Sequence, residues 1–149
     1  VSLWQLQIES NGSTLFARDA LDPRRPPKER VLGIPFGNGG GIAFPFGALR
    51  DLGDLAVVHK SSADLGPMVV FWDSAASAAM AYRSAALGLT FEVRDGAFVD
   101  VDTGSRWSLD GEALSGPLAG QRLVPVRDAY VSFWFAFATF METPEIWSP

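Results

Sequence analysis

The acidic side chains around the single histidine are the first residues in this chain with the means to do chemistry. His59 is the only histidine, and Asp51, Asp54 and Asp64 lie near it in the sequence. An imidazole combined with carboxylates can supply a general acid and a general base, or can ligate a metal ion. The same residues are also the normal content of a solvated loop, so both interpretations stay open here.

A second polar cluster follows later in the chain, with Asp100, Asp102, Thr103 and Ser105 close together. Its spacing is similar to the start of a calcium loop, but the third acid and the final glutamate are missing and the glycine comes one residue early. A hairpin turn, in which the Asp and Thr oxygens accept hydrogen bonds from nearby amides above Trp107, explains the same residues. Asp100, Asp102 and His59 are therefore the candidate metal ligands.

The absence of cysteine excludes several classes of site. A chain without cysteine has no disulfide framework, no covalent haem attachment and no structural zinc site of the usual kind. A Ser-His triad would have to use His59, and no sequence motif identifies a nucleophile near this residue. We therefore assign no catalytic residue and expect no cofactor.

A glycine-rich segment, residues 37–41, is the next candidate for binding chemistry. Glycines after a strand can hold a phosphate when a helix begins directly behind them. Here a second strand-like run, residues 42–46, follows the glycines instead. The segment thus favours a hairpin turn over a nucleotide site.

Net charge and hydropathy limit the kinds of partner that the chain can bind. The net charge is −5 and the chain has no run of basic residues, which argues against a nucleic-acid partner. No apolar run is long enough for a transmembrane segment, and the N-terminus lacks the pattern of a secretory signal. Because the first residue is Val1, we expect a processed or trimmed chain.

Short apolar runs separated by turn residues predict the elements that must position these side chains. Asp95-Gly96 and Asp110-Gly111 each separate two strand-like runs, a strong signal for hairpins. The alanine-rich run 74–86 suits either a strand or a helix. We predict a mainly β fold, an antiparallel meander or barrel-like sheet over residues 31–149, preceded by an N-terminal arm at residues 1–30.

The aromatic segment near the C-terminus differs from the rest. Residues 127–140 predict one short helix, with Asp128 as its N-cap and Thr143-Pro144 as its stop. Apolar side chains cover almost its whole circumference, so more than one side needs a covering layer. It is either a core helix across the sheet or a contact for a protein partner, a second copy or a membrane interface. The predicted partner-binding residues are Tyr130, Phe133, Trp134, Phe135 and Phe137.

Several segments, from about Arg18 to Trp147, resemble the DUF3179 family of uncharacterised bacterial and archaeal proteins. Their order and spacing agree with that family throughout. The matching pieces are residues 18–23, 31–34, 43–45, 67–72, 81–83, 89–91, 100–107, 116–120 and 143–147, of which 100–107 is the most specific.

Many members of this family carry a CPLC-like motif, whose two cysteines fall on Trp72 and Ala75 in this chain. The chain is therefore similar to a cysteine-free branch, and a redox or metal role of that motif is not carried over. Leaders or lipid anchors are frequent in the family, so the resemblance implies an extracytoplasmic location more than an activity.

Two functions from different classes follow. The first is a non-catalytic extracytoplasmic binding or accessory module, or a subunit of a larger assembly, that uses the aromatic segment for contact. The second is a metal-binding domain or an enzyme that uses His59 with nearby Asp residues, or the Asp100 and Asp102 turn. The tryptophans also permit an aromatic platform for a carbohydrate or apolar ligand, if Trp4, Trp72, Trp134 and Trp147 are exposed.

Overall fold

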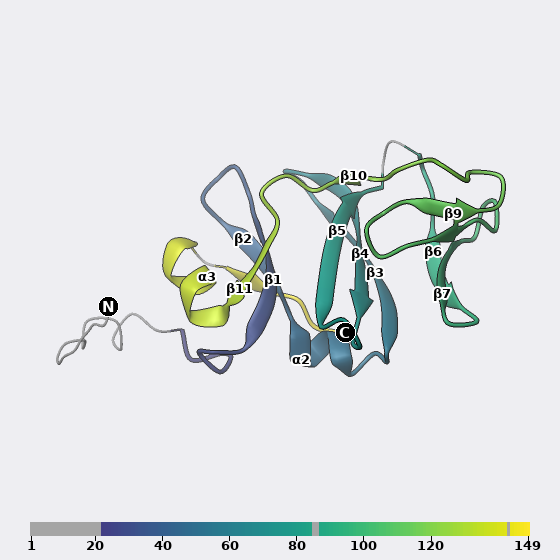
Figure 1. Cartoon of the computed structure of the whole chain (residues 1–149). Coiled ribbons are helices and arrows are strands. Elements are labelled where there is room, and N and C mark those ends of the chain that lie inside the picture. Colours follow the sequence, from purple (N-terminus) through teal and green to yellow (C-terminus); the bar gives the residue numbers. More distant parts are fainter. Residues whose placement is uncertain (1–21, 85–86, 143) are drawn as a thin grey trace, which may run out of the picture.

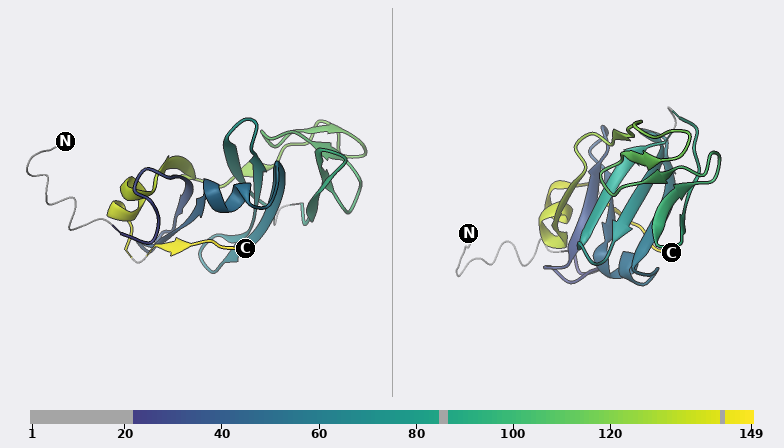
Figure 2. Two further views of the ribbon diagram at one scale, coloured as in Figure 1. Left: turned by 90° about the horizontal axis from the view of Figure 1, so that it is seen from below. Right: turned by 45° about the vertical axis from the view of Figure 1, so that its right-hand side comes forward.

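Three four-stranded sheets and two short helices make up the described part of the computed structural model, residues 22–84, 87–142 and 144–149. Helix α3, sheet A, sheet B and sheet C follow one another as layers (Figures 1 and 2). The prediction of a mainly antiparallel β fold with one short C-terminal helix is confirmed. The barrel-like alternative is wrong for the described residues, because the strands divide into separate stacked sheets. Most of the predicted N-terminal arm lies outside the described residues.

Sheet A has the strand order β11-β1-β2-β12, in which β12 runs parallel to β2 and the other pairs are antiparallel. Strand β2 is buried along its whole length because sheet B covers one of its faces and α3 the other. Residues 37–40 form the predicted β1–β2 hairpin turn, in which the Phe36 N–H donates to the Gly40 carbonyl at 2.7 Å. The strands of sheet A are β1 (Arg30–Pro35), β2 (Gly41–Pro45), β11 (Tyr130–Phe133) and β12 (Glu145–Ile146).

Sheet B has the order β10-β5-β4-β3 and lies in the middle of the stack. Strand β4 reads as an unbroken apolar run because both of its faces are covered. Met68, Val70 and Trp72 face sheet A, while Val69 and Phe71 face sheet C. The alanine-rich run contains a strand, since it pairs with β4. The strands are β3 (Leu55–Ser62), β4 (Gly66–Asp73), β5 (Ala78–Arg83) and β10 (Val124–Pro125).

Sheet C is a meander in the order β6-β7-β8-β9. Asp95 and Gly96, at φ +52° and +72°, form the predicted turn between β6 and β7, since a two-residue hairpin turn of this type needs positive φ at both positions. Asp110-Gly111 lies in the predicted turn between β8 and β9. The strands are β6 (Phe91–Arg94), β7 (Ala97–Asp100), β8 (Arg106–Trp107) and β9 (Ala113–Ser115).

The structure has one helix that the sequence does not predict, and the C-terminal helix is shorter than predicted. Helix α2 (Phe46–Arg50) follows β2 directly and packs Phe46 edge-on against Trp72, with ring centroids 4.9 Å apart. Helix α3 (Trp134–Phe140) begins seven residues after Arg127, the predicted start. Within the described residues, no helix has the length and apolarity needed to cross a membrane.

The predicted helix cap at Asp128 is wrong, because residues 130–133 form a strand. Asp128 has φ +64° and lies in the turn before β11. Pairing with β1 provides partners for this strand, and the Trp134 N–H donates to the Glu29 carbonyl at 2.8 Å. A long-range pairing thus overrides the local helical pattern, and β11 and α3 divide the aromatic residues between them.

Candidate functional site

The polar turn at residues 100–107 is a closed network of hydrogen bonds. Asp100 and Ser105 are fully buried. The Thr103 N–H and hydroxyl donate to Asp100 Oδ1 at 2.6 and 2.7 Å, and the Trp107 indole N–H donates to Oδ2 at 2.8 Å. The Ser105 hydroxyl lies 2.7 Å from the Thr103 hydroxyl and accepts the Leu118 N–H at 3.0 Å. Both carboxylate oxygens of Asp100 are therefore engaged by this turn.

The electrostatics of Asp100 follow from the same contacts. Burial raises the pKa of its carboxyl, but the hydrogen bonds from Trp107 and Thr103 favour the charged form and bring the pKa below its ordinary value. Asp102, the second candidate ligand, has a separate role, since its Oδ2 accepts the Thr90 N–H at 2.8 Å. The hairpin interpretation therefore accounts for these residues.

His59 lies on β3 and joins sheet B to sheet C. Its Nε2 is 3.2 Å from the Phe91 nitrogen and 3.1 Å from the Phe91 oxygen. The ring also stacks on Phe91, with centroids 6.4 Å apart. One nitrogen of the imidazole thus faces the backbone of β6, and it accepts or donates according to the tautomer.

The three aspartates near His59 in sequence do not gather around it. Asp64 Oδ2 accepts the Gly37 N–H at 2.8 Å, so this carboxylate binds the glycine-rich turn between β1 and β2. Asp51 caps the C-terminus of α2, and the Asp54 carbonyl accepts the Ser74 N–H at 2.8 Å. Among the residues that the structure describes, no three His, Asp or Glu side chains form a group able to hold a metal ion.

Two of the five predicted partner-binding residues are not available for contact. Trp134 and Phe137 are fully buried against Val31 and Ala43 of sheet A, because positions three apart on a helix share one face. Their assignment to a contact surface is corrected accordingly. Tyr130, Phe133 and Phe135 are 39 %, 43 % and 36 % exposed and stay predicted contact residues.

Two exposed residues of the same segment were missed by the sequence reasoning. Val131 is 45 % exposed and Phe140 is 77 % exposed. In a strand, side chains two residues apart lie on the same face, so Val131 and Phe133 share one face of β11. This alternation would have identified Val131, but it applies only once β11 is known to be a strand. We call the exposed apolar residues of these two elements the β11–α3 surface, which consists of Tyr130, Val131, Phe133, Phe135 and Phe140.

The described tryptophans form no exposed platform. Trp72, Trp107 and Trp134 are buried, and Trp147 packs on Phe44 with ring centroids 5.7 Å apart. Trp4 lies outside the described residues. Trp72, at a position of the CPLC-like motif, has a buried indole N–H without a hydrogen-bond partner among the described residues. Ala75, the other motif position, lies in the exposed β4–β5 turn.

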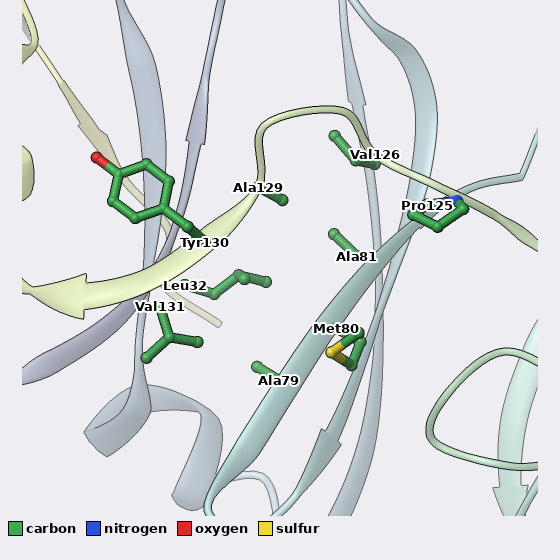
Figure 3. A pocket seen from close by; sticks show the side chains of 9 residues that line it. All are labelled: Leu32, Ala79, Met80, Ala81, Pro125, Val126, Ala129, Tyr130 and Val131. Carbon is green, nitrogen blue, oxygen red and sulfur yellow. The ribbon is translucent and has the colours of Figure 1, made fainter.

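An apolar cavity of about 240 Å³ lies where sheet A and sheet B meet at one side of the molecule (Figure 3). Leu32 and Val131 line it from sheet A, and Ala79, Met80 and Ala81 line it from β5. The Tyr130 hydroxyl points away from Met80 and Ala81 in Figure 3. The cavity therefore offers shape and apolar surface but no charged group.

The comparison with protein families agrees with the resemblance seen in the sequence. The chain matches the family described as "Protein of unknown function (DUF3179)" over residues 4–144. No curated protein and no solved structure matches the chain. The match spans the polar turn, sheets B and C, sheet A except for β12, and the β11–α3 surface, and the chain belongs to the DUF3179 family.

Proposed function

We propose that this chain is a non-catalytic binding or accessory module and that the β11–α3 surface is its contact with a partner protein or a second copy. The observation that carries the proposal is the exposure of Val131, Phe133 and Phe140 beside buried residues of the same segment. The proposal includes an extracytoplasmic location, which is supported by the leaders and anchors frequent in the family. It also includes a place in a larger assembly.

The chemistry of the surface supports a contact role. Residues 129–141 contain no charged side chain, although the whole chain has a net charge of −5. Removing apolar surface from water is worth about 25 cal/mol per Å², and aromatic residues are enriched in the centre of protein interfaces. The rings of Phe133 and Phe135 stack with centroids 6.1 Å apart, and together they form an apolar area that a partner could bury.

The state of the polar residues supports a non-catalytic role. Asp100, Asp102 and Asp64 each accept hydrogen bonds from backbone amides, and the His59 ring nitrogen faces the Phe91 backbone. A catalytic group must be free to reach a substrate atom, whereas these groups hold turns and sheets together.

Site-specific photocrosslinking in cells that make the full protein tests the proposal. Phe135 is replaced by the photoreactive residue p-benzoylphenylalanine, which keeps an aromatic ring on the β11–α3 surface. We expect a discrete crosslinked species, because the partner covers this surface. A Phe133→Ser substitution in the same chain should remove most of that species, with a loss of folding stability below about 1 kcal/mol, since Phe133 is half exposed.

Leu114 on β9 is the matched control. It is 62 % exposed on sheet C, so the same photoreactive residue is at least as accessible there. Equal crosslinking from positions 114 and 135, or no discrete species from position 135, would contradict the proposal.

A further inference from the structure

Two cationic side chains border the β11–α3 surface where β1 begins. The first is Arg30, which is directly opposite Phe133 in the pairing of β1 with β11. The Trp134 N–H donates to the Glu29 carbonyl, so these two residues form a hydrogen-bonded pair of the ladder and the next pair along it is not hydrogen-bonded. In an antiparallel sheet, the side chains of a non-hydrogen-bonded pair are the closest cross-strand neighbours. The Arg30 side chain therefore lies beside that of Phe133.

The second cation, Lys28, is held at the same surface by a turn. Residues 26–29 form this turn, which is closed by a hydrogen bond of 3.1 Å from its last N–H to its first carbonyl. The Phe135 N–H donates to the Pro27 carbonyl at 3.0 Å, so Lys28, the next residue in the turn, is adjacent to the start of α3. Figures 1 and 2 show the purple segment before β1 beside α3 at one end of the molecule. A lysine and an arginine thus border the two stacked rings of the β11–α3 surface.

The acidic side chains of this segment are already paired. Asp22 binds Arg24 at 2.7 Å, and Glu29 binds Arg25 at 2.6 Å. The lysine and the arginine beside the rings are exposed, and neither forms an ion pair with any residue that the structure describes. This end of the molecule therefore presents positive charge next to an apolar surface, although the whole chain has a net charge of −5.

We infer that the partner of the β11–α3 surface is a segment of another protein that carries carboxylates next to an apolar side chain. The apolar side chain covers the rings of Phe133 and Phe135. One carboxylate accepts two parallel hydrogen bonds from the Arg30 guanidinium, and a second binds the Lys28 ammonium. Arginine and aromatic residues are common among those that dominate the binding energy of protein interfaces. This inference rests on the proposed function and adds the chemistry of the partner.

The charge distribution separates this partner from a second copy and from a membrane. In a two-fold contact centred on the β11–α3 surface, Lys28 and Arg30 of the two copies approach each other and repel. An anionic membrane faces the whole end of the molecule, so the net charge of −5 opposes its approach. A carboxylate on a protein segment interacts mainly with charges within about 8 Å, the screening length at physiological ionic strength. The two cations therefore favour an acidic protein segment.

Charge reversal combined with photocrosslinking from position 135, in cells that make the full protein, tests the inference. Arg30→Glu and Lys28→Glu are introduced in separate variants. We expect each to reduce the crosslinked species roughly tenfold, because a like charge then faces the carboxylate of the partner. Circular dichroism and thermal unfolding of the purified variants check the fold.

Arg106→Glu is the matched control, since Arg106 is an exposed arginine on β8 of sheet C that forms no ion pair among the described residues. It changes the net charge as Arg30→Glu does and should leave the crosslinked species within about twofold of its original level, because distant charges are screened.

Mass spectrometry of the crosslinked species gives a second test, which needs no change at Lys28 or Arg30. We expect an Asp or Glu of the partner within about three residues of the crosslinked position, since three residues of an extended segment span roughly 10 Å. This measurement also applies if charge reversal unfolds the chain.

Full crosslinking by either charge-reversal variant, an equal loss with Arg106→Glu, or a partner segment without a carboxylate would overturn the inference. A crosslink to a second copy of this chain would do the same. In each of these cases a discrete crosslinked protein leaves the proposed function standing. Both fail if position 135 crosslinks to nothing, or if it crosslinks to phospholipid and the purified full chain binds vesicles of phosphatidylglycerol.

Discussion

The polar turn at residues 100–107 and the β11–α3 surface differ in residue type and in how far their side chains already have interaction partners. The turn holds the residue types of a catalytic or metal site, yet its buried Asp100 is saturated by Thr103 and Trp107. The β11–α3 surface contains no carboxylate and no imidazole, yet Val131 and Phe133 leave apolar area in water.

The difference shows that the type of a side chain is a weaker guide to function than the interactions it still lacks. A buried carboxylate with its hydrogen bonds complete stabilises the fold, and opening it to a ligand would cost those bonds. For an exposed apolar surface, the favourable free energy of removal from water is obtained only when a partner covers it. We therefore expect mutations in the turn to act on stability and mutations on the surface to act on assembly.

The largest expected effect is that of Asp100→Ala. The change leaves the buried Trp107 N–H and the Thr103 donors without an acceptor, so we expect a loss of about 3 kcal/mol in the free energy of unfolding. Urea denaturation measures it, with Asp102→Asn as the control at below about 1 kcal/mol. A midpoint shift produced by calcium in the unmutated protein would contradict the structural role of this turn.

Acidification gives the next largest effect. Since the folded state lowers the pKa of Asp100, its contribution to stability is fully present above the ordinary value of 3.8 and is lost as the pH falls from there through the lower folded-state pKa. Asp100→Asn, which cannot titrate, should therefore flatten the stability curve at acid pH. Parallel curves for the two proteins, measured by thermal unfolding, would argue against a lowered pKa.

The smallest expected effect is that of His59→Ala, below about 1 kcal/mol, because the side chain is exposed. Its contact with the Phe91 backbone should still appear locally, as faster hydrogen exchange of the Phe91 amide. A binding site centred on His59 would instead give a large loss of affinity for an added zinc ion. Calorimetry with zinc separates the two outcomes.

Much of the fold follows from local patterns in the sequence. The β1–β2 hairpin and the turns at Asp95-Gly96 and Asp110-Gly111 are predictable because glycine and aspartate adopt positive φ at low cost. The turn network around Asp100 is predictable for a related reason, since Asp and Thr oxygens bond amides only a few residues away. Nothing local, however, indicates that the strands form three stacked sheets in place of one meander or barrel.

The division of the aromatic segment into a strand and a helix is the feature that local sequence patterns predict least well. Residues 130–133 have side chains that suit a strand or a helix, and only their pairing with β1 decides for the strand. That pairing in turn decides that Trp134 and Phe137 are buried while Val131 and Phe133 are exposed.

The β class, the hairpin turns, the family and the absence of cysteine chemistry are predictable from the amino-acid sequence, because they depend on composition or on contacts between near neighbours. Only the folded chain shows which polar side chains already have hydrogen-bond partners and which aromatic residues reach the surface. These properties depend on contacts between residues far apart in the chain, and such contacts leave no periodic signal in the sequence.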